Sequence, residues 1–119
     1  MRKVGSQEFQ ELSEVPLFNL IGCYADQKGY DVVYFKTLMP KEIVEIDDNF
    51  RVKHKYMHYI HLYKDEEMKI SIYFDKHNLG CMFPEYPYYE LYDRCDTERF
   101  LDTDEEEMNL FDRVQELIR

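Results

Sequence analysis

The chain has no tryptophan, and only three cysteines, four glycines and four prolines among its 119 residues. An odd number of widely spaced cysteines (Cys23, Cys81 and Cys95) is not the pattern of a disulfide-stapled secreted domain. We therefore expect reduced thiols in a reducing compartment. Because the few glycines are not clustered, the sequence contains no P-loop and no dinucleotide-binding motif.

Long apolar runs are also missing. The longest, Leu17 to Tyr24, is far shorter than the roughly 20 residues of a membrane-spanning helix. The first residues are followed by Glu8 and Glu11 and not by the apolar stretch of a secretion signal. These absences predict a cytoplasmic protein with no membrane partner.

Aromatic residues and acids are abundant. Hydrophobic residues make up 45% of the chain and aromatic residues 16%, which is ample for the core of a single domain spanning residues 1–119. The net charge of −10 comes entirely from residues 65–119, which hold sixteen acids against six bases. Such asymmetry concerns partners and solubility, not the fold.

The middle of the sequence predicts strands. The stretch Met68–Phe74 alternates apolar and polar residues, the pattern of a half-buried strand. Turn residues at 47–49, 64–67 and 75–80 separate it from other segments rich in β-branched and aromatic residues. We expect an α+β fold whose centre, residues 30–83, is an antiparallel meander of four or five strands. These are Tyr30–Thr37, Glu42–Ile46, Phe50–Tyr63, Met68–Phe74 and a short one at Cys81–Phe83.

One of these strands has a competing interpretation. Val52, Tyr56, Ile60 and Tyr63 would also line one face of a helix. The clean strand that follows and the aromatic-rich composition favour a strand.

Helices are expected at the two ends. Thr103 and Glu106 form a capping box, and apolar residues at helical spacing predict an amphipathic helix over residues 104–118. A short N-terminal helix is predicted from Ser6 to about Ser13, with Phe9 and Leu12 facing inward. Three other segments have no clear periodicity. Leu17–Ile21 is left open between helix and strand, Ala25–Gly29 is expected to be a loop, and Pro84–Tyr92 is expected to be extended or irregular.

Catalytic and metal-binding patterns are weak. None of the three serines lies in a strand-turn-helix elbow, and pairing of Cys81 with a histidine is a generic possibility. His54, His58 and His61 would converge on one face of a helix, but on a strand His61 faces away from the other two. We therefore expect no enzymatic activity, no metal and no cofactor.

A basic and aromatic sheet face is the alternative functional hypothesis. Stacking rings interleaved with positive charge bind single-stranded nucleic acid, although a net charge of −10 disfavours direct contact with phosphates. The residues are Arg51, Lys53, Lys55, Tyr59, His61 and Tyr63, with Lys69, Ser71 and Tyr73 on the neighbouring strand.

The acidic, tyrosine-rich stretch 85–107 is the feature on which the main hypothesis depends. It holds ten acids and only two arginines. Carboxylates steer a basic partner, and tyrosines anchor it; the plain alternative is a solubilising surface. The predicted partner-binding residues are Glu85, Tyr86, Tyr88, Tyr89, Glu90, Tyr92, Asp93, Asp96, Glu98, Asp102, Asp104 and Glu105.

Charge and size suggest an analogy for the partner. Small acidic domains without catalytic signatures recur as inhibitors or antidotes, such as phage-type nucleic-acid mimics, anti-CRISPR-like proteins and immunity proteins. We expect this protein to occupy a basic, nucleic-acid-accepting site of a larger protein.

Overall fold

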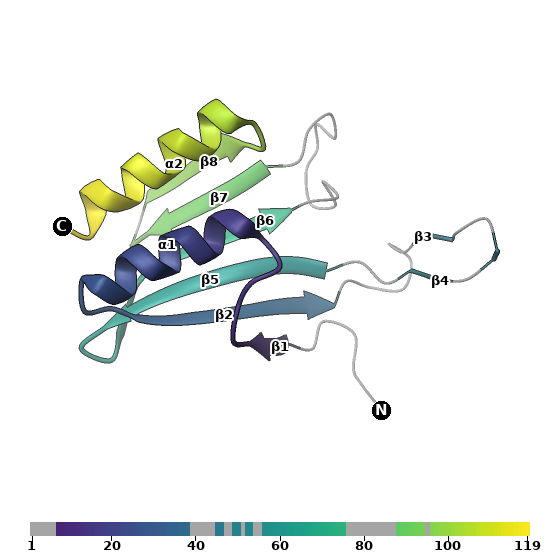
Figure 1. The fold of residues 1–119 in the computed structure, drawn as a ribbon, viewed down its shortest axis with the longest axis horizontal. Helices are drawn as coiled ribbons and strands as arrows, with labels where there is room; N and C mark the ends of the chain where they lie inside the picture. Colours follow the sequence, from purple (N-terminus) through teal and green to yellow (C-terminus); the bar gives the residue numbers. More distant parts are fainter. Residues whose placement is uncertain are drawn as a thin grey trace.

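The computed structural model describes residues 7–38, 45–46, 49–50, 52–53, 56–75, 88–94 and 96–119. A six-stranded antiparallel sheet, in the order β1-β2-β5-β6-β7-β8, carries both helices on one face (Figure 1). β3 and β4 form a separate two-stranded sheet. The elements are β1 (Gln7–Gln10), α1 (Pro16–Gln27), β2 (Asp31–Leu38), β3 (Glu45–Ile46), β4 (Val52–Lys53), β5 (Tyr56–Lys64), β6 (Glu67–Asp75), β7 (Tyr88–Asp93), β8 (Asp96–Leu101) and α2 (Asp104–Leu117).

The predicted α+β class is confirmed, but the extent of the sheet is wrong. The sheet has six strands, not four or five, and runs from residue 7 to residue 101, well beyond the predicted 30–83. Strand β2 is confirmed nearly as predicted, and of the strand predicted at 42–46 the described part is β3. The turns predicted at 47–48 and 76–80 and the strand predicted at 81–83 lie outside the described residues.

The competing helix over residues 52–63 is excluded where the chain is described. β5 pairs with β2 on one side and with β6 on the other. The predicted turn after β5 is also confirmed, with Asp65 and Glu66 both at positive φ, as a two-residue type I′ hairpin requires. Arg51, His54 and Lys55 lie outside the described residues.

Strand β6 follows the predicted alternation with one exception. Ile70, Ile72 and Phe74 are buried beneath the helices, whereas Met68 is 46% exposed. The pairing register shifts between Leu62 and Tyr63 of β5, where β6 contains one extra residue, Lys69. Met68 therefore faces the side opposite to Ile70, because one extra residue reverses the side that a strand side chain faces.

The N-terminal helix prediction is wrong. Residues 7–10 form β1, an edge strand paired with β2, and Phe9 and Leu12 are 71% and 69% exposed. Ser6 lies outside the described residues. Pairing with the free edge of β2 and contact of the Phe9 ring with Phe35, at 5.8 Å between centroids, outweigh the helical spacing of two apolar residues.

The segment left open at Leu17–Ile21 is helical and belongs to α1. Pro16 stands at the first position of that helix, where a missing N–H costs nothing. The loop predicted at Ala25–Gly29 is wrong, because α1 continues to Gln27. Its end is a Schellman motif: Gly29 has φ +87°, and the Gly29 and Tyr30 amides donate to Asp26 and Ala25.

Residues 88–101 form a hairpin that the sequence did not reveal. Tyr88–Asp93, expected to be irregular, is strand β7, and β8 was not predicted. β8 is a polar edge strand in which only Phe100 is buried, so it shows little apolar alternation.

The C-terminal helix is confirmed together with its cap. The Thr103 hydroxyl accepts a hydrogen bond from the Glu106 amide at 3.2 Å. Leu110, Val114 and Ile118, spaced by four, are almost completely buried. Met108, predicted on the inward face, is 61% exposed.

Candidate functional site

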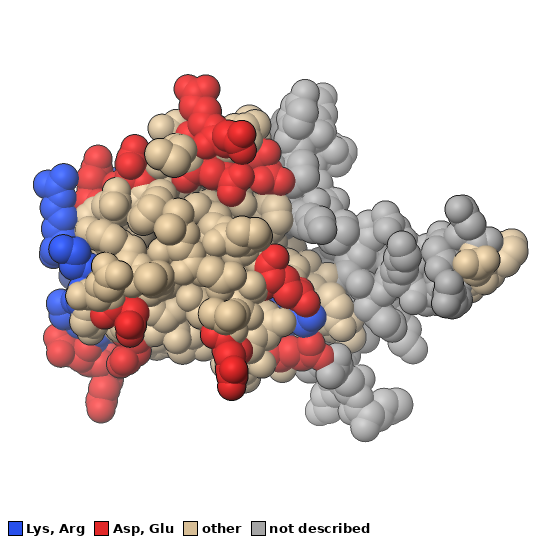
Figure 2. All heavy atoms as spheres, in the orientation of Figure 1, with Lys and Arg blue, Asp and Glu red and all other residues tan. Residues whose placement is uncertain are grey.

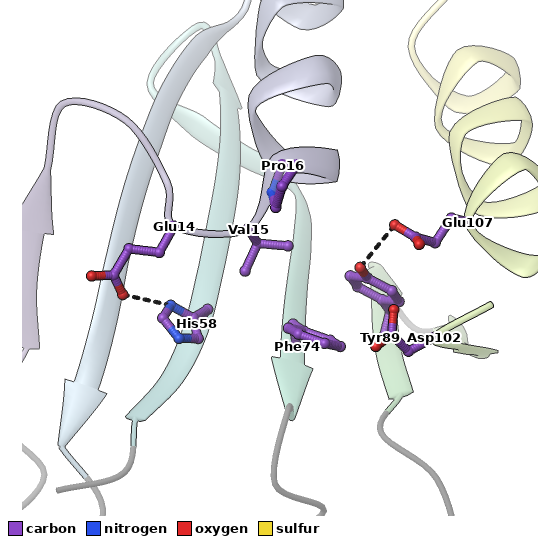
Figure 3. A pocket seen from close by; sticks show the side chains of 8 residues that line it. All are labelled: Glu14, Val15, Pro16, His58, Phe74, Tyr89, Asp102 and Glu107. Carbon is purple, nitrogen blue, oxygen red and sulfur yellow. Dashed lines mark hydrogen bonds and ion pairs between the residues drawn. The ribbon is translucent and has the colours of Figure 1, made fainter. Parts of the chain in front are cut away.

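A pocket of about 520 Å³ opens where the first turns of both helices meet the sheet (Figure 3). Its floor is a cross-strand row, in which His58 of β5 pairs with Phe74 of β6 and Phe74 pairs with Tyr89 of β7. The segment leading into α1 and the start of α2 form its two walls. The other lining residues are Glu14, Val15, Pro16, Asp102 and Glu107.

Glu14 is positioned by a hydrogen-bonded turn before α1. The Ser13 hydroxyl accepts from the Val15 amide at 3.0 Å. The Asn19 side chain closes the turn from the first turns of the helix, accepting from the Ser13 amide and donating to its carbonyl, both at 2.9 Å. This clamp holds the intervening Glu14 above the end of the sheet.

Two side chains lie next to the Glu14 carboxylate: a lysine, which is positively charged, and a histidine, which is charged only when protonated. Its carboxylate lies 3.2 Å from Lys36 Nζ and 3.7 Å from His58 Nδ1. Lys36 and His58 are cross-strand partners on β2 and β5, so the sheet register brings both under the Glu14 turn. Lys36 is shared with Glu8, whose carboxylate lies 3.8 Å from the same Nζ, so one lysine serves two acids beside this wall.

The opposite wall is acidic. The hydroxyl of Tyr89 donates to Glu107 Oε2 at 3.1 Å (Figure 3). Burial, followed by the adjacent negative charge of Glu107, raises the pKa of Tyr89, which therefore remains a neutral donor. In the described part of the chain, Asp102 and Glu107 form no ion pair, and no Lys or Arg lines the pocket.

The acidic wall continues along the first turn of α2. Asp104, Glu105, Glu106 and Glu107 are consecutive there. Acidic side chains gather over this half of α2, and most of the lysines and arginines seen on this face lie at its left edge (Figure 2). Carboxylates in the first turn stabilise the helix through its dipole, so folding and charge display coincide.

The structure brings only some of the predicted partner-binding residues together. Asp102, Asp104 and Glu105 lie at this acidic end. Asp93 and Asp96 face each other at the far end of the β7–β8 hairpin, and Glu85 and Tyr86 lie outside the described residues.

The remaining predicted residues divide between the two faces of the sheet. Tyr89 is in the core, 2% exposed, stacked on Phe74 at 4.4 Å between centroids, and it cannot anchor a partner in this structure. Glu98 is 2.9 Å from Arg113 of α2. Tyr88, Glu90 and Tyr92 point to the face without helices, because side chains alternate along β7.

The residues of the nucleic-acid hypothesis are only partly assembled. Tyr59 and Tyr73 are direct cross-strand partners on the face without helices, and Tyr63 lies on the same face. Arg51 and Lys55 are outside the described residues, and Lys53 belongs to β4, not to the six-stranded sheet.

The histidines divide as the strand interpretation predicted. His58 lies beneath the helices, whereas His61 lies on the other face among Phe35, Tyr59 and Tyr63. Burial lowers the pKa of His61 and keeps it neutral. No cluster of three metal-ligating side chains occurs in the described ranges, where Cys23 is an exposed free thiol.

Glu14, His58, Phe74 and Glu107 were not predicted to form the site. They come from four separate segments that are joined by strand register and by the two helix starts. No spacing in the sequence indicates this convergence.

No protein-family model, curated protein or solved structure matches this chain. Among the described residues, no helix is both long and apolar enough to cross a membrane.

Proposed function

We propose that this chain is a small, non-enzymatic, cytoplasmic binding protein that docks its acidic end onto a basic site of a larger protein. The site it covers is one that normally accepts nucleic acid, and the protein acts as an inhibitor or antidote. The observation that carries this proposal is the pocket whose uncompensated carboxylates, Asp102 and Glu107, continue into the acidic first turn of α2.

The pocket has the chemistry that a lysine or arginine side chain requires. Carboxylates at one wall supply charge-assisted hydrogen bonds, and the apolar lining residues Val15, Pro16 and Phe74 supply contact for the side-chain stem. The acids outside it steer a basic partner during approach. The anchor is thus a pocket that receives a partner's side chain and not the tyrosine set expected from the sequence.

Two variants that each remove three negative charges test the docking surface. The acidic-end variant combines Asp102→Asn, Asp104→Asn and Glu105→Gln. The control, Asp93→Asn, Asp96→Asn and Asp112→Asn, removes three exposed or half-exposed acids elsewhere. A partner recovered by affinity capture from the producing cells is used for binding kinetics at several salt concentrations.

The acidic-end variant is expected to associate about tenfold more slowly at low salt and to show a flatter salt dependence, because steering is a screened, long-range effect. The control is expected to stay near the parent. Equal association rates and salt slopes for parent and acidic-end variant would show that these acids only solubilise the protein. Displacement of the partner's nucleic acid by the parent tests the inhibitory part of the proposal.

A further inference from the structure

The face of the sheet that carries no helix is formed by a continuous aromatic row. Cross-strand pairing aligns Phe9, Phe35, Tyr59 and Tyr73 across β1, β2, β5 and β6. The ring centroids of successive members are 5.8, 4.7 and 5.9 Å apart. On β7 the row continues to Tyr92, whose ring stacks on Tyr73 at 5.8 Å.

Apolar side chains at the margin of this face are exposed. Phe9 on β1, Tyr92 on β7 and Leu101 on β8 are 71%, 38% and 41% exposed, and Met68 joins them because of the bulge. Both described helices pack on the other face, so neither covers these residues. Between these margins Phe35 and Tyr88 are buried, and Tyr59, His61 and Tyr73 are half-buried. An apolar sheet face that both helices leave uncovered is typical of an interaction site.

Several polar groups of the face on β6, β7 and β8 pair with one another. Tyr92 donates to Glu90 at 3.2 Å, and Arg99 lies 3.5 Å from the other oxygen of Glu90. The hydroxyls of Tyr73 and Tyr88 are 3.4 Å apart, and Arg99 covers the Tyr88 ring at 4.4 Å. Pairing of these groups lowers the cost of dehydrating this part of the face.

The charge of the face selects the kind of occupant. Across the aromatic row and its β7–β8 continuation, the one described arginine is paired with the one described glutamate, so the centre is neutral. His61 is neutral as well, since burial lowers its pKa. Nucleic acid needs unpaired cations for its phosphates. A neutral aromatic face instead matches another neutral aromatic face.

The size of the face also fits a protein interface. Six strands spaced about 4.8 Å apart, averaging about seven residues at 3.3 Å each, give a projected area of roughly 670 Å². Part of this area is already covered within one chain, since Phe35, Tyr88 and Glu90 are 5%, 3% and 9% exposed, so the face offers a small interface. A standard interface buries about 800 Å² per partner.

We infer that the helix-free face of the sheet is a homodimer interface, occupied by the same face of a second copy of this chain. The two sheets stack face to face about 10 Å apart, with their aromatic rows in contact. A two-fold arrangement uses the same patch on both copies. The pocket and the acidic start of α2 lie on the helix side and stay accessible in the dimer.

The first test is the mass of the unaltered protein by sedimentation equilibrium over about a hundredfold range of micromolar concentration. A concentration-dependent shift from one to two copies of 14.6 kDa is expected. Added salt should strengthen the dimer, because it screens repulsion between two chains of net charge −10. Salt weakens docking to a basic partner, so the two interactions respond in opposite directions.

The second test uses matched charge insertions. Tyr92→Glu and Leu101→Glu each place a carboxylate on the helix-free face, and Met108→Glu places one on α2. The first two are expected to raise the dimer dissociation constant at least about tenfold and the third to leave it near the parent value. Circular dichroism and thermal melting verify that each variant is folded.

Three results would overturn the inference. The parent could be monomeric throughout the concentration range. Alternatively, Met108→Glu could break the dimer while both face variants leave it intact. Finally, a labelled single-stranded oligonucleotide could bind the parent and lose its affinity in Tyr92→Glu, which would make nucleic acid the occupant of the face.

Discussion

At the scale of single residues, Gly22 of α1 lies directly against the side chain of Tyr34 on β2. A methyl group at this position would overlap the hydroxyl of Tyr34 on β2 and come within 2.8 Å of its Cζ. Glycine is therefore required here by space, although it weakens the helix by about 1 kcal/mol relative to alanine. The sequence showed an interrupted apolar run, not this contact.

We expect Gly22→Ala to lower the free energy of unfolding by about 1–2 kcal/mol, because overpacking exceeds the gain in helix propensity. The loss should shrink in a Tyr34→Phe background, which lacks the overlapping hydroxyl. Urea denaturation of the two single variants and the double variant measures the coupling. Cys23→Ala, at an exposed site of the same helix, is the control. A stabilising Gly22→Ala would contradict the contact.

Tyr89 shows why the candidate site could be predicted only in part. Tyr88 and Tyr89 are adjacent in the sequence, but strand geometry places them on opposite faces of the sheet. From the sequence alone, residues 88–93 were not recognised as a strand. All the tyrosines of this stretch were therefore expected to be equally available to a partner. The acids at the start of α2 stayed together because a helix cap, readable from Thr103 and Glu106, fixes them in space.

At the scale of elements, the β5–β6 hairpin contains local strain. Asp65 and Glu66 have φ of 55° and 63°, a region that side chains other than glycine adopt at a cost of about 1–2 kcal/mol per residue. The register of the central hairpin depends on this turn.

Glu66→Gly is expected to raise the free energy of unfolding by about 0.5–1 kcal/mol, since relief of strain exceeds the added flexibility of the unfolded chain. Glu66→Gln removes the same charge but keeps the strain, so it should stay near the parent. Thermal or urea unfolding of both variants compares them. Equal shifts in the two would assign the effect to charge.

The elements that the sequence predicted are those with a strong local signal. α2 has a capping box, and β6 has alternation over seven residues. β1 was mistaken for a helix because its structure is determined by pairing with β2, which is remote in sequence. α1 was obscured by Pro16, which is a helix breaker in the interior but a favoured residue at the first position.

At the scale of the whole molecule, tyrosines with raised pKa values link stability to alkaline pH. Burial raises the pKa of Tyr34, Tyr89 and Tyr92 above the ordinary value of 10.0. Nearby negative charges add to the shift, from Glu107 at Tyr89 and from Glu90 at Tyr92. The unfolded chain therefore releases these protons at a lower pH than the folded one.

The resulting stability is fully present below about pH 10 and is lost as the pH rises above it. We expect the urea midpoint to fall steeply above that pH, and the fall to be shallower in Tyr89→Phe. Tyrosinate absorbance followed along the same titration should show a late fraction that ionises together with unfolding. An unchanged slope in Tyr89→Phe would contradict this assignment.

The short edge strand β1 also makes domain swapping between two copies of the chain accessible. The four residues of β1, Gln7–Gln10, pair only with Tyr34 to Thr37 in the second half of β2. In the chain, α1 lies between the two strands. Its release would break little of the sheet and would leave α1 and the buried core in place. The uncovered edge of β2 would then accept the equivalent strand of a neighbouring molecule. Strand β1 is therefore the segment that this fold is expected to exchange in a domain-swapped dimer.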